Sequence, residues 1–183
     1  MPTTKMAQRW RDILAAGILI SSAESYAQSS QPWEAVVRMN AQNNTIAYTY
    51  ENRFGTVIGT TRNFDSGIDL RSPPPQPAGI HAYQQTDDNV AVLRHYISPT
   101  GANTSFRGRI QYNNFTPASA SIRFQGLPGT HWTLLTFSDI ILSDLTAANS
   151  ITNNQDIAIS TATKSYIVTK KPLFKKVAAE KNQ

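Results

Sequence analysis

Apolar and polar residues alternate with a period of two through most of this chain, in short runs rich in threonine, tyrosine, isoleucine and valine. Such runs are typical of strands with one buried and one solvated face. Turn-forming residues such as Asn43-Asn44 and Asn153-Asn154 separate them. Nine short strands are predicted, at residues 33–39, 45–50, 79–84, 90–97, 105–112, 119–124, 132–137, 155–160 and 165–169.

Helical periodicity is absent from this pattern except for a short turn predicted around residues 143–148. Nine alternating strands favour two antiparallel sheets packed face to face. The predicted fold is therefore all-β, an antiparallel β-sandwich of the immunoglobulin-like or jelly-roll-like kind.

The segment 51–78 breaks the alternation. It holds glycines, asparagines, aspartates and a proline-rich run at 73–77, which is too poor in amide donors for a central strand. We expect a long connection between two sheets, with the prolines leading in an extended path into the strand that starts at Gly79.

Both ends of the chain differ from its body. Lys5, Arg9 and Arg11 precede an apolar run of about ten residues, and Ser25-Tyr26-Ala27 places small residues where signal peptidase cleaves. Residues 1–27 are predicted to be a secretory signal peptide, because the apolar run is about half as long as a membrane-spanning helix. The mature protein is expected to be secreted, periplasmic or held at the cell surface.

Charge separates the body from the end of the chain. Residues 28–163 hold eight arginines and nine acidic residues, whereas all the mature lysines follow from Lys164 onward. The net charge of +5 thus comes from the lysine-rich end of the chain, and recognition of nucleic acid by the body is not expected. The domain is predicted to span 28–171, followed by a basic, disordered tail at 172–183 that contacts anionic surfaces weakly or keeps the protein soluble.

The chain has no cysteine, so its core and its backbone hydrogen bonds must hold the fold. Cofactors are not expected, and few residues indicate chemistry. The residues Asp65 and Asp69 in a glycine-containing turn offer the oxygen ligands that calcium prefers. A turn in which these carboxylates bind local backbone amides explains the same residues with fewer assumptions.

Enzymatic activity is not expected. His81, His95 and His131 have no metal-ligand spacing, and no G-x-S-x-G sequence indicates a nucleophilic serine. Trp33 and Trp132, with several tyrosines, could stack on sugar rings, although in-phase aromatic residues are more often core.

Four segments of the chain, taken in order, resemble a known family. They are Phe54-Gly55-Thr56, the turn at 63–69 with its Phe64-Asp65-Ser66-Gly67-Ile68-Asp69 sequence, the proline run at 73–77 and the strand residues Ile80-His81-Ala82-Tyr83. This series resembles a poorly characterised β-sandwich module of large bacterial secreted and surface proteins. The resemblance covers roughly residues 48–169 and implies a secreted accessory module without a defined activity. We therefore expect an exported, non-catalytic module that binds a protein or glycan at the cell surface. The alternatives are a carbohydrate-binding module and a self-assembling subunit that pairs strands with its neighbours.

Overall fold

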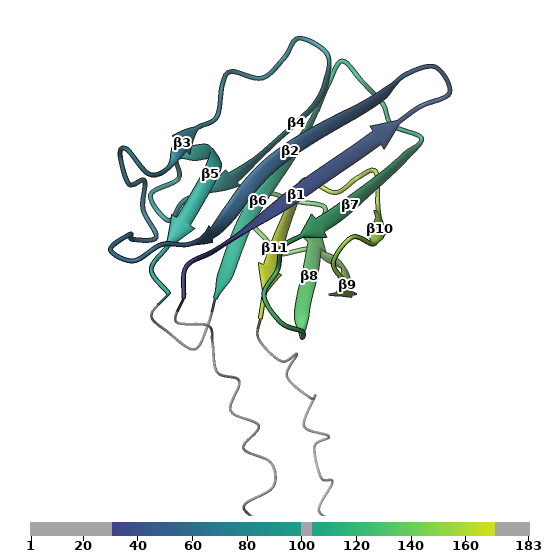
Figure 1. Ribbon diagram of the computed structural model, residues 1–183. Helices are drawn as coiled ribbons and strands as arrows, with labels where there is room; N and C mark the ends of the chain where they lie inside the picture. Colours follow the sequence, from purple (N-terminus) through teal and green to yellow (C-terminus); the bar gives the residue numbers. More distant parts are fainter. Residues whose placement is uncertain (1–30, 100–103, 171–183) are drawn as a thin grey trace, which may run out of the picture.

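The computed structural model describes residues 31–99 and 104–170 (Figure 1). These residues form eleven strands and no helix, which confirms the all-β prediction. These residues therefore contain no helix that could span a bilayer. The predicted signal peptide at 1–27 and the predicted tail at 172–183 lie outside the described residues.

All nine predicted strands are present, and two more join them. The strands are β1 (Trp33–Gln42), β2 (Ala47–Thr56), β3 (Leu70–Arg71), β4 (Gly79–Gln85), β5 (Ala91–Ile97), β6 (Ser105–Asn113), β7 (Ser119–Gln125), β8 (Trp132–Phe137), β9 (Leu145–Ile151), β10 (Asp156–Ile159) and β11 (Ser165–Thr169).

Three local predictions need correction. β9 occupies the segment where a helical turn was expected, because pairing with β8 outweighs the helix propensity of its alanines. β2 runs to Thr56, into the predicted long connection, because its end pairs with both β1 and β5. β3 adds two residues within that connection, held by pairing with β5.

Hydrogen bonding joins the strands into one mixed sheet in the order β10-β7-β1-β2-β5-β4-β6-β11-β8-β9, with β3 on β5. The prediction of a wholly antiparallel arrangement is wrong, because β2 and β5 pair in parallel. The two separate sheets expected of a sandwich are likewise replaced by a continuous one. Its end strands, β9 and β10, are consecutive in sequence and touch, so the sheet curls almost into a closed cylinder.

The curl places β2, β1 and β7 in front of β6, β11 and β8 (Figure 1). We call the outer surface of β10, β7, β1 and β2 the front face, and that of β4, β6, β11 and β8 the back face. Aromatic rings fill the space between them. Trp33 meets Phe54, Phe106 and Trp132 edge to face, with ring centroids 5.5–6.0 Å apart.

Tyr166 lies at the centre of this core and is fully buried. Its hydroxyl accepts a hydrogen bond of 2.8 Å from Gln84 Nε2, which satisfies a polar atom far from water. The ring lies against Gly108 of β6, where an added Cβ would stand 2.0 Å from Tyr166 Cζ. Glycine is therefore required at 108 by the packing of the ring.

The first and last described strands meet at one end of the molecule. β1 starts at Trp33, whose ring contacts Trp132, and β11 ends at Thr169 opposite Thr133. The β1–β2 hairpin and the proline segment lie at the opposite end (Figure 1). The two faces run between these ends and are the main exposed surfaces of the sheet.

Candidate functional site

The two aspartates predicted as calcium ligands lie in the loop before β3. Asp65 accepts a 2.6 Å hydrogen bond from the Thr61 amide, and the Asp65 amide donates to Asp69 Oδ2 at 2.9 Å. The other Asp69 oxygen accepts the Tyr96 amide at 2.9 Å. The carboxylates thus bind backbone amides and tie the loop to β5.

This arrangement favours the turn interpretation of Asp65 and Asp69 over the calcium interpretation. Within the described residues, no group of three or more histidine, cysteine, aspartate or glutamate side chains could hold a metal ion. Calcium binding by these two aspartates stays a prediction.

His95 lies beside this loop anchor. Its Nδ1 is 3.5 Å from Asp69 Oδ2, and both side chains are almost fully buried. Burial lowers the pKa of His95, and the charge of Asp69 opposes that shift. Arg62 and Asp87 form an ion pair of 2.9 Å nearby. The charge of Arg62 lowers the pKa of His95 and that of Asp87 raises it, both by smaller amounts.

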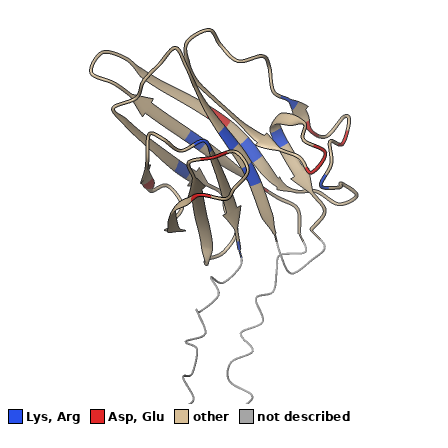
Figure 2. Cartoon of the chain, turned by 180° about the vertical axis from the view of Figure 1, so that it is seen from behind, with Lys and Arg blue, Asp and Glu red and all other residues tan. Residues whose placement is uncertain are grey.

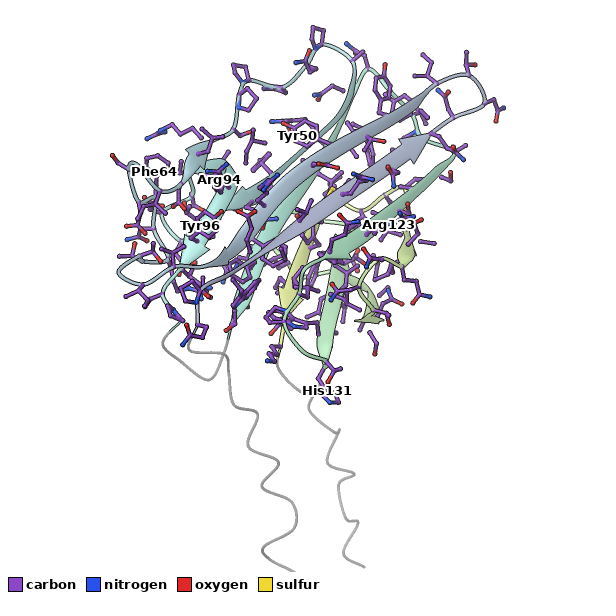
Figure 3. The ribbon with its side chains drawn as sticks, viewed as in Figure 1. Tyr50, Phe64, Arg94, Tyr96, Arg123 and His131 are labelled. Carbon is purple, nitrogen blue, oxygen red and sulfur yellow. The ribbon has the colours of Figure 1, made fainter. Side chains whose placement is uncertain are left out.

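The three histidines do not converge. His81 on β4 contacts the ring of Tyr50, whereas His131 lies at the opposite end of the molecule from Tyr50 (Figure 3). Nε2 of His81 lies 2.9 Å from Ser72 Oγ, and its Nδ1 lies 3.5 Å from the Gln111 amide oxygen. Ser72, His81 and Gln111 thus lie in one chain of polar contacts, in which the neutral Gln111 amide stands where a Ser-His-Asp triad has its carboxylate.

The tryptophans do not form the stacking platform considered from the sequence. Trp132 is buried, and Trp33 packs against the same core. A sugar-binding surface on this molecule must therefore depend on other side chains.

The front face carries such a surface. A shallow groove of about 410 Å³ crosses four strands near the β1–β2 hairpin. Cross-strand register places Ala158, Ser121, Asn40 and Thr49 in one row across the groove. The next row brings together Ser119, Gln42 and Ala47.

The groove exists because small residues stand at matching outward positions on neighbouring strands. Residues opposite each other in antiparallel strands share a face, so alanine, serine and threonine side chains leave a trough between longer neighbours. Thr49 Oγ1 donates to Asn40 Oδ1 at 2.9 Å, which leaves the Asn40 amide hydrogens to point elsewhere. Asparagine, glutamine, serine and threonine side chains line the groove together with four alanines and Tyr48, and none of the lining residues is charged.

Two ion pairs lie next to the groove. Arg38 binds Glu51, and Arg123 binds Asp156, in the next row along the same strands. Figure 3 shows Arg123 on the front strand β7. The hydrogen bond from Arg123 lowers the pKa of Asp156, as expected of a carboxylate paired with a cation.

Arg53 of β2 is paired as well, with Glu34 at 2.6 Å. Each arginine of the front strands β1, β2 and β7 thus has an acidic partner on a neighbouring strand. The positive charges of these three arginines are therefore neutralised locally.

The back face differs. Arg107 and Arg109 on β6, and Lys164 before β11, have no acidic group within 4.0 Å among the described residues. Arg109 Nε donates instead to the neutral Gln85 amide oxygen at 2.5 Å. Seen from behind in Figure 2, basic positions lie along the middle strands and most acidic positions lie in loops.

An apolar loop overhangs these cations. Residues 138–144 connect β8 to β9, and Ile140 and Ile141 within them are 52% and 77% exposed. Ile140 lines two adjoining hollows of about 270 and 480 Å³, one with Arg107 and Arg109 and the other with Lys164. Within the described part of the chain, the back face thus combines cations that have no acidic partner with exposed apolar side chains.

No protein-family model, curated protein or solved structure matches this chain. The resemblance to the module of bacterial secreted proteins accordingly stays a prediction. Function must be argued from the two faces themselves.

Proposed function

We propose that this chain is an exported, non-catalytic interaction module that binds a neutral carbohydrate chain at the cell surface through the front-face groove. The single observation that carries the proposal is the uncharged groove across four strands, in which hydroxyl and amide side chains stand among alanines. The arginines in the next row are neutralised by acidic partners. The predicted signal peptide supports the exported location.

The chemistry of the groove suits sugars. An asparagine or glutamine amide both donates and accepts, and a serine or threonine hydroxyl does the same, so each can match adjacent sugar hydroxyls. Gln42, Ser119 and Thr49 are exposed and need no rearrangement to meet a ligand. A neutral ligand fits because Arg38 and Arg123 already have acidic partners.

A protein partner fits this groove less well. Cores of protein interfaces are enriched in large aromatic and apolar side chains, whereas this trough is built from small residues with Tyr48 at its edge. Self-assembly by strand addition also fits less well, because the free edges of β9 and β10 approach each other. The proposal therefore takes the glycan as partner.

We also propose that the architecture of the domain is a variant of the sandwich predicted from the sequence. The front and back layers act as the two halves of a sandwich through which one hydrogen-bonded sheet runs. The groove then occupies the outer surface of one half.

A glycan array followed by calorimetric titration of the purified protein tests the proposal. We expect one class of neutral glycan to bind, and Asn40→Ala to weaken it about tenfold by removing a hydrogen-bonding amide. Ala158→Leu should fill the groove and also weaken binding. Ala148→Leu is the matched control, because it adds the same bulk to an exposed alanine of β9 outside the groove.

Two results would oppose the proposal. One is an array without a neutral glycan that binds at millimolar concentration. The other is a glycan whose affinity falls equally in Ala158→Leu and Ala148→Leu, which would place its site away from the groove.

A further inference from the structure

The 138–144 loop exposes apolar residues although its backbone is well held. The Asp139 carboxylate accepts hydrogen bonds of 3.1 Å from the Ser143 amide and 3.3 Å from the Asp144 amide. Ser138 N donates to Asp144 O at 3.1 Å, which closes the base of the loop. The loop is therefore an ordered turn with Ile140 and Ile141 at its tip.

One further contact and one backbone conformation fix the position of the loop over the back face. Ser165 Oγ of β11 donates to the Asp139 carbonyl at 2.5 Å. Leu142 adopts a positive φ of 63°, a conformation that branched side chains rarely take and that turns the chain back toward β9. The tip thus projects beside Arg109, with its apolar side chains directed away from the core.

Cations without acidic partners among the described residues lie next to this tip. Cross-strand register places Arg107 opposite Ile167, which is opposite Leu135, so charge and apolar surface adjoin on the same face. The neighbouring row sets Arg109 beside Ser165 under the loop. An amphipathic surface of this kind fits an interface where anionic headgroups border hydrocarbon.

We propose that the back face docks the domain on an anionic membrane surface, with the tip of the 138–144 loop entering the headgroup region. The guanidinium groups of Arg107 and Arg109 and the Lys164 ammonium meet lipid phosphates. The front-face groove then points away from the membrane, toward glycans above it.

The loop also carries two acids, which bear on the strength of docking. Asp139 and Asp144 offset part of the positive charge, and hydrogen bonding from Ser143 lowers the pKa of Asp139, which keeps it ionised. Their carboxylates are engaged with the loop itself. Apolar contact by the tip must therefore supply part of the affinity, which separates this docking from attraction of the lysine-rich tail alone.

The absence of cysteine allows a direct test with the full chain. Ile141→Cys and Ile58→Cys each receive one environment-sensitive dye. Ile58, 72% exposed, is the matched control, because it is a similarly exposed isoleucine in the turn that follows the front strand β2. Vesicles of phosphatidylcholine with phosphatidylglycerol should shift the dye emission at position 141 to shorter wavelength and leave position 58 unchanged.

A second variant measures the contribution of the tip to affinity. Ile140→Ser with Ile141→Ser should weaken binding to the same vesicles about tenfold, because two apolar side chains no longer enter the interface. Both positions are exposed, so the melting temperature should change little.

The alternatives give distinct results. Vesicle binding without a spectral change at 141 would assign attachment to the tail and overturn the proposal. Equal shifts at 141 and 58 would indicate non-specific adsorption and overturn it too. A larger response to a soluble acidic polysaccharide than to vesicles would indicate that the back face binds a polyanion, and would overturn the proposal. A shift that depends on protein concentration without vesicles would indicate that it binds a second copy of the chain, and would overturn the proposal as well.

Discussion

The front and back faces carry arginines on one continuous sheet but in opposite electrostatic situations. On the front, Arg38, Arg53 and Arg123 each bind an acid on a neighbouring strand. On the back, Arg107 and Arg109 have neutral neighbours in the described part of the chain. The comparison shows that the position of the acids, and not the number of arginines, distinguishes a neutral surface from a cationic one.

The difference extends to the apolar residues. The front-face groove is lined mainly by small and uncharged side chains, which leave a hollow for a ligand. The back face keeps Ile140 and Ile141 in water at the tip of an ordered loop. Exposed apolar side chains beside unpaired cations destabilise a free protein only slightly, but they favour a partner that is both apolar and anionic.

The largest effect is expected from the core beneath the back face. In Gly108→Ala the new Cβ would meet the buried Tyr166 ring at 2.0 Å, so β6, which carries Arg107 and Arg109, must shift relative to β11. We expect a loss of about 3 kcal/mol in the free energy of unfolding, measured by urea denaturation.

Tyr166→Phe is the control for this variant, because it keeps the ring and removes only the hydroxyl that binds Gln84. It should cost about 1 kcal/mol. If Gly108→Ala costs no more than Tyr166→Phe, the Tyr166 ring packs less tightly against β6 than the structure indicates.

A smaller effect is expected from pH, which should change the stability of the fold through His95 but not the charge of the arginines on its faces. Burial holds the pKa of His95 below its ordinary value of 6.5, so the folded imidazole stays neutral where the unfolded one takes a proton. This contribution to stability is fully present above about pH 6.5 and is lost as the pH falls toward the lowered pKa.

Urea midpoints at pH 7.5, 6.5 and 5.5 should therefore decrease in the wild type and decrease less in His95→Gln. The arginines of both faces keep their charge over this range, so vesicle binding by the folded protein should change less than about twofold. An identical pH slope in His95→Gln would show that another group governs the dependence.

Local patterns predicted the strands well because each strand buries one face, and β4 begins at Gly79 as the proline run indicated. β9 was missed because Leu145-Thr146-Ala147-Ala148 does not alternate and lies at an edge where little is buried. The parallel pairing of β2 with β5 joins segments far apart in the chain, and no local pattern encodes it.

The candidate sites were harder to predict for the same reason. Asp65 and Asp69 look alike in sequence, but only the fold shows that Tyr96 and Thr61 supply their hydrogen bonds. The groove draws Ser121, Asn40 and Ala158 from three strands, so it depends on register. Alternating Ser119 and Ser121 was the one local signal of a face without large side chains.

The most direct test of the contrast between the faces compares two double variants that remove the same charge. Arg107→Gln with Arg109→Gln removes two back-face cations that have no acidic partner among the described residues, and Arg38→Gln with Arg123→Gln removes two paired cations from the front. Binding to phosphatidylglycerol-containing vesicles is measured for both at one ionic strength, alongside urea denaturation.

We predict that the back-face variant loses roughly 30-fold in vesicle affinity, from about 1 kcal/mol for each cation near an anionic surface, and keeps its stability. The front-face variant should bind within about twofold of the wild type, because cations on the far face lie beyond the screening length, and should lose a little stability with its ion pairs. Equal losses of vesicle affinity in the two variants would contradict membrane docking by the back face, because binding would then follow net charge and not the pairing that distinguishes the faces.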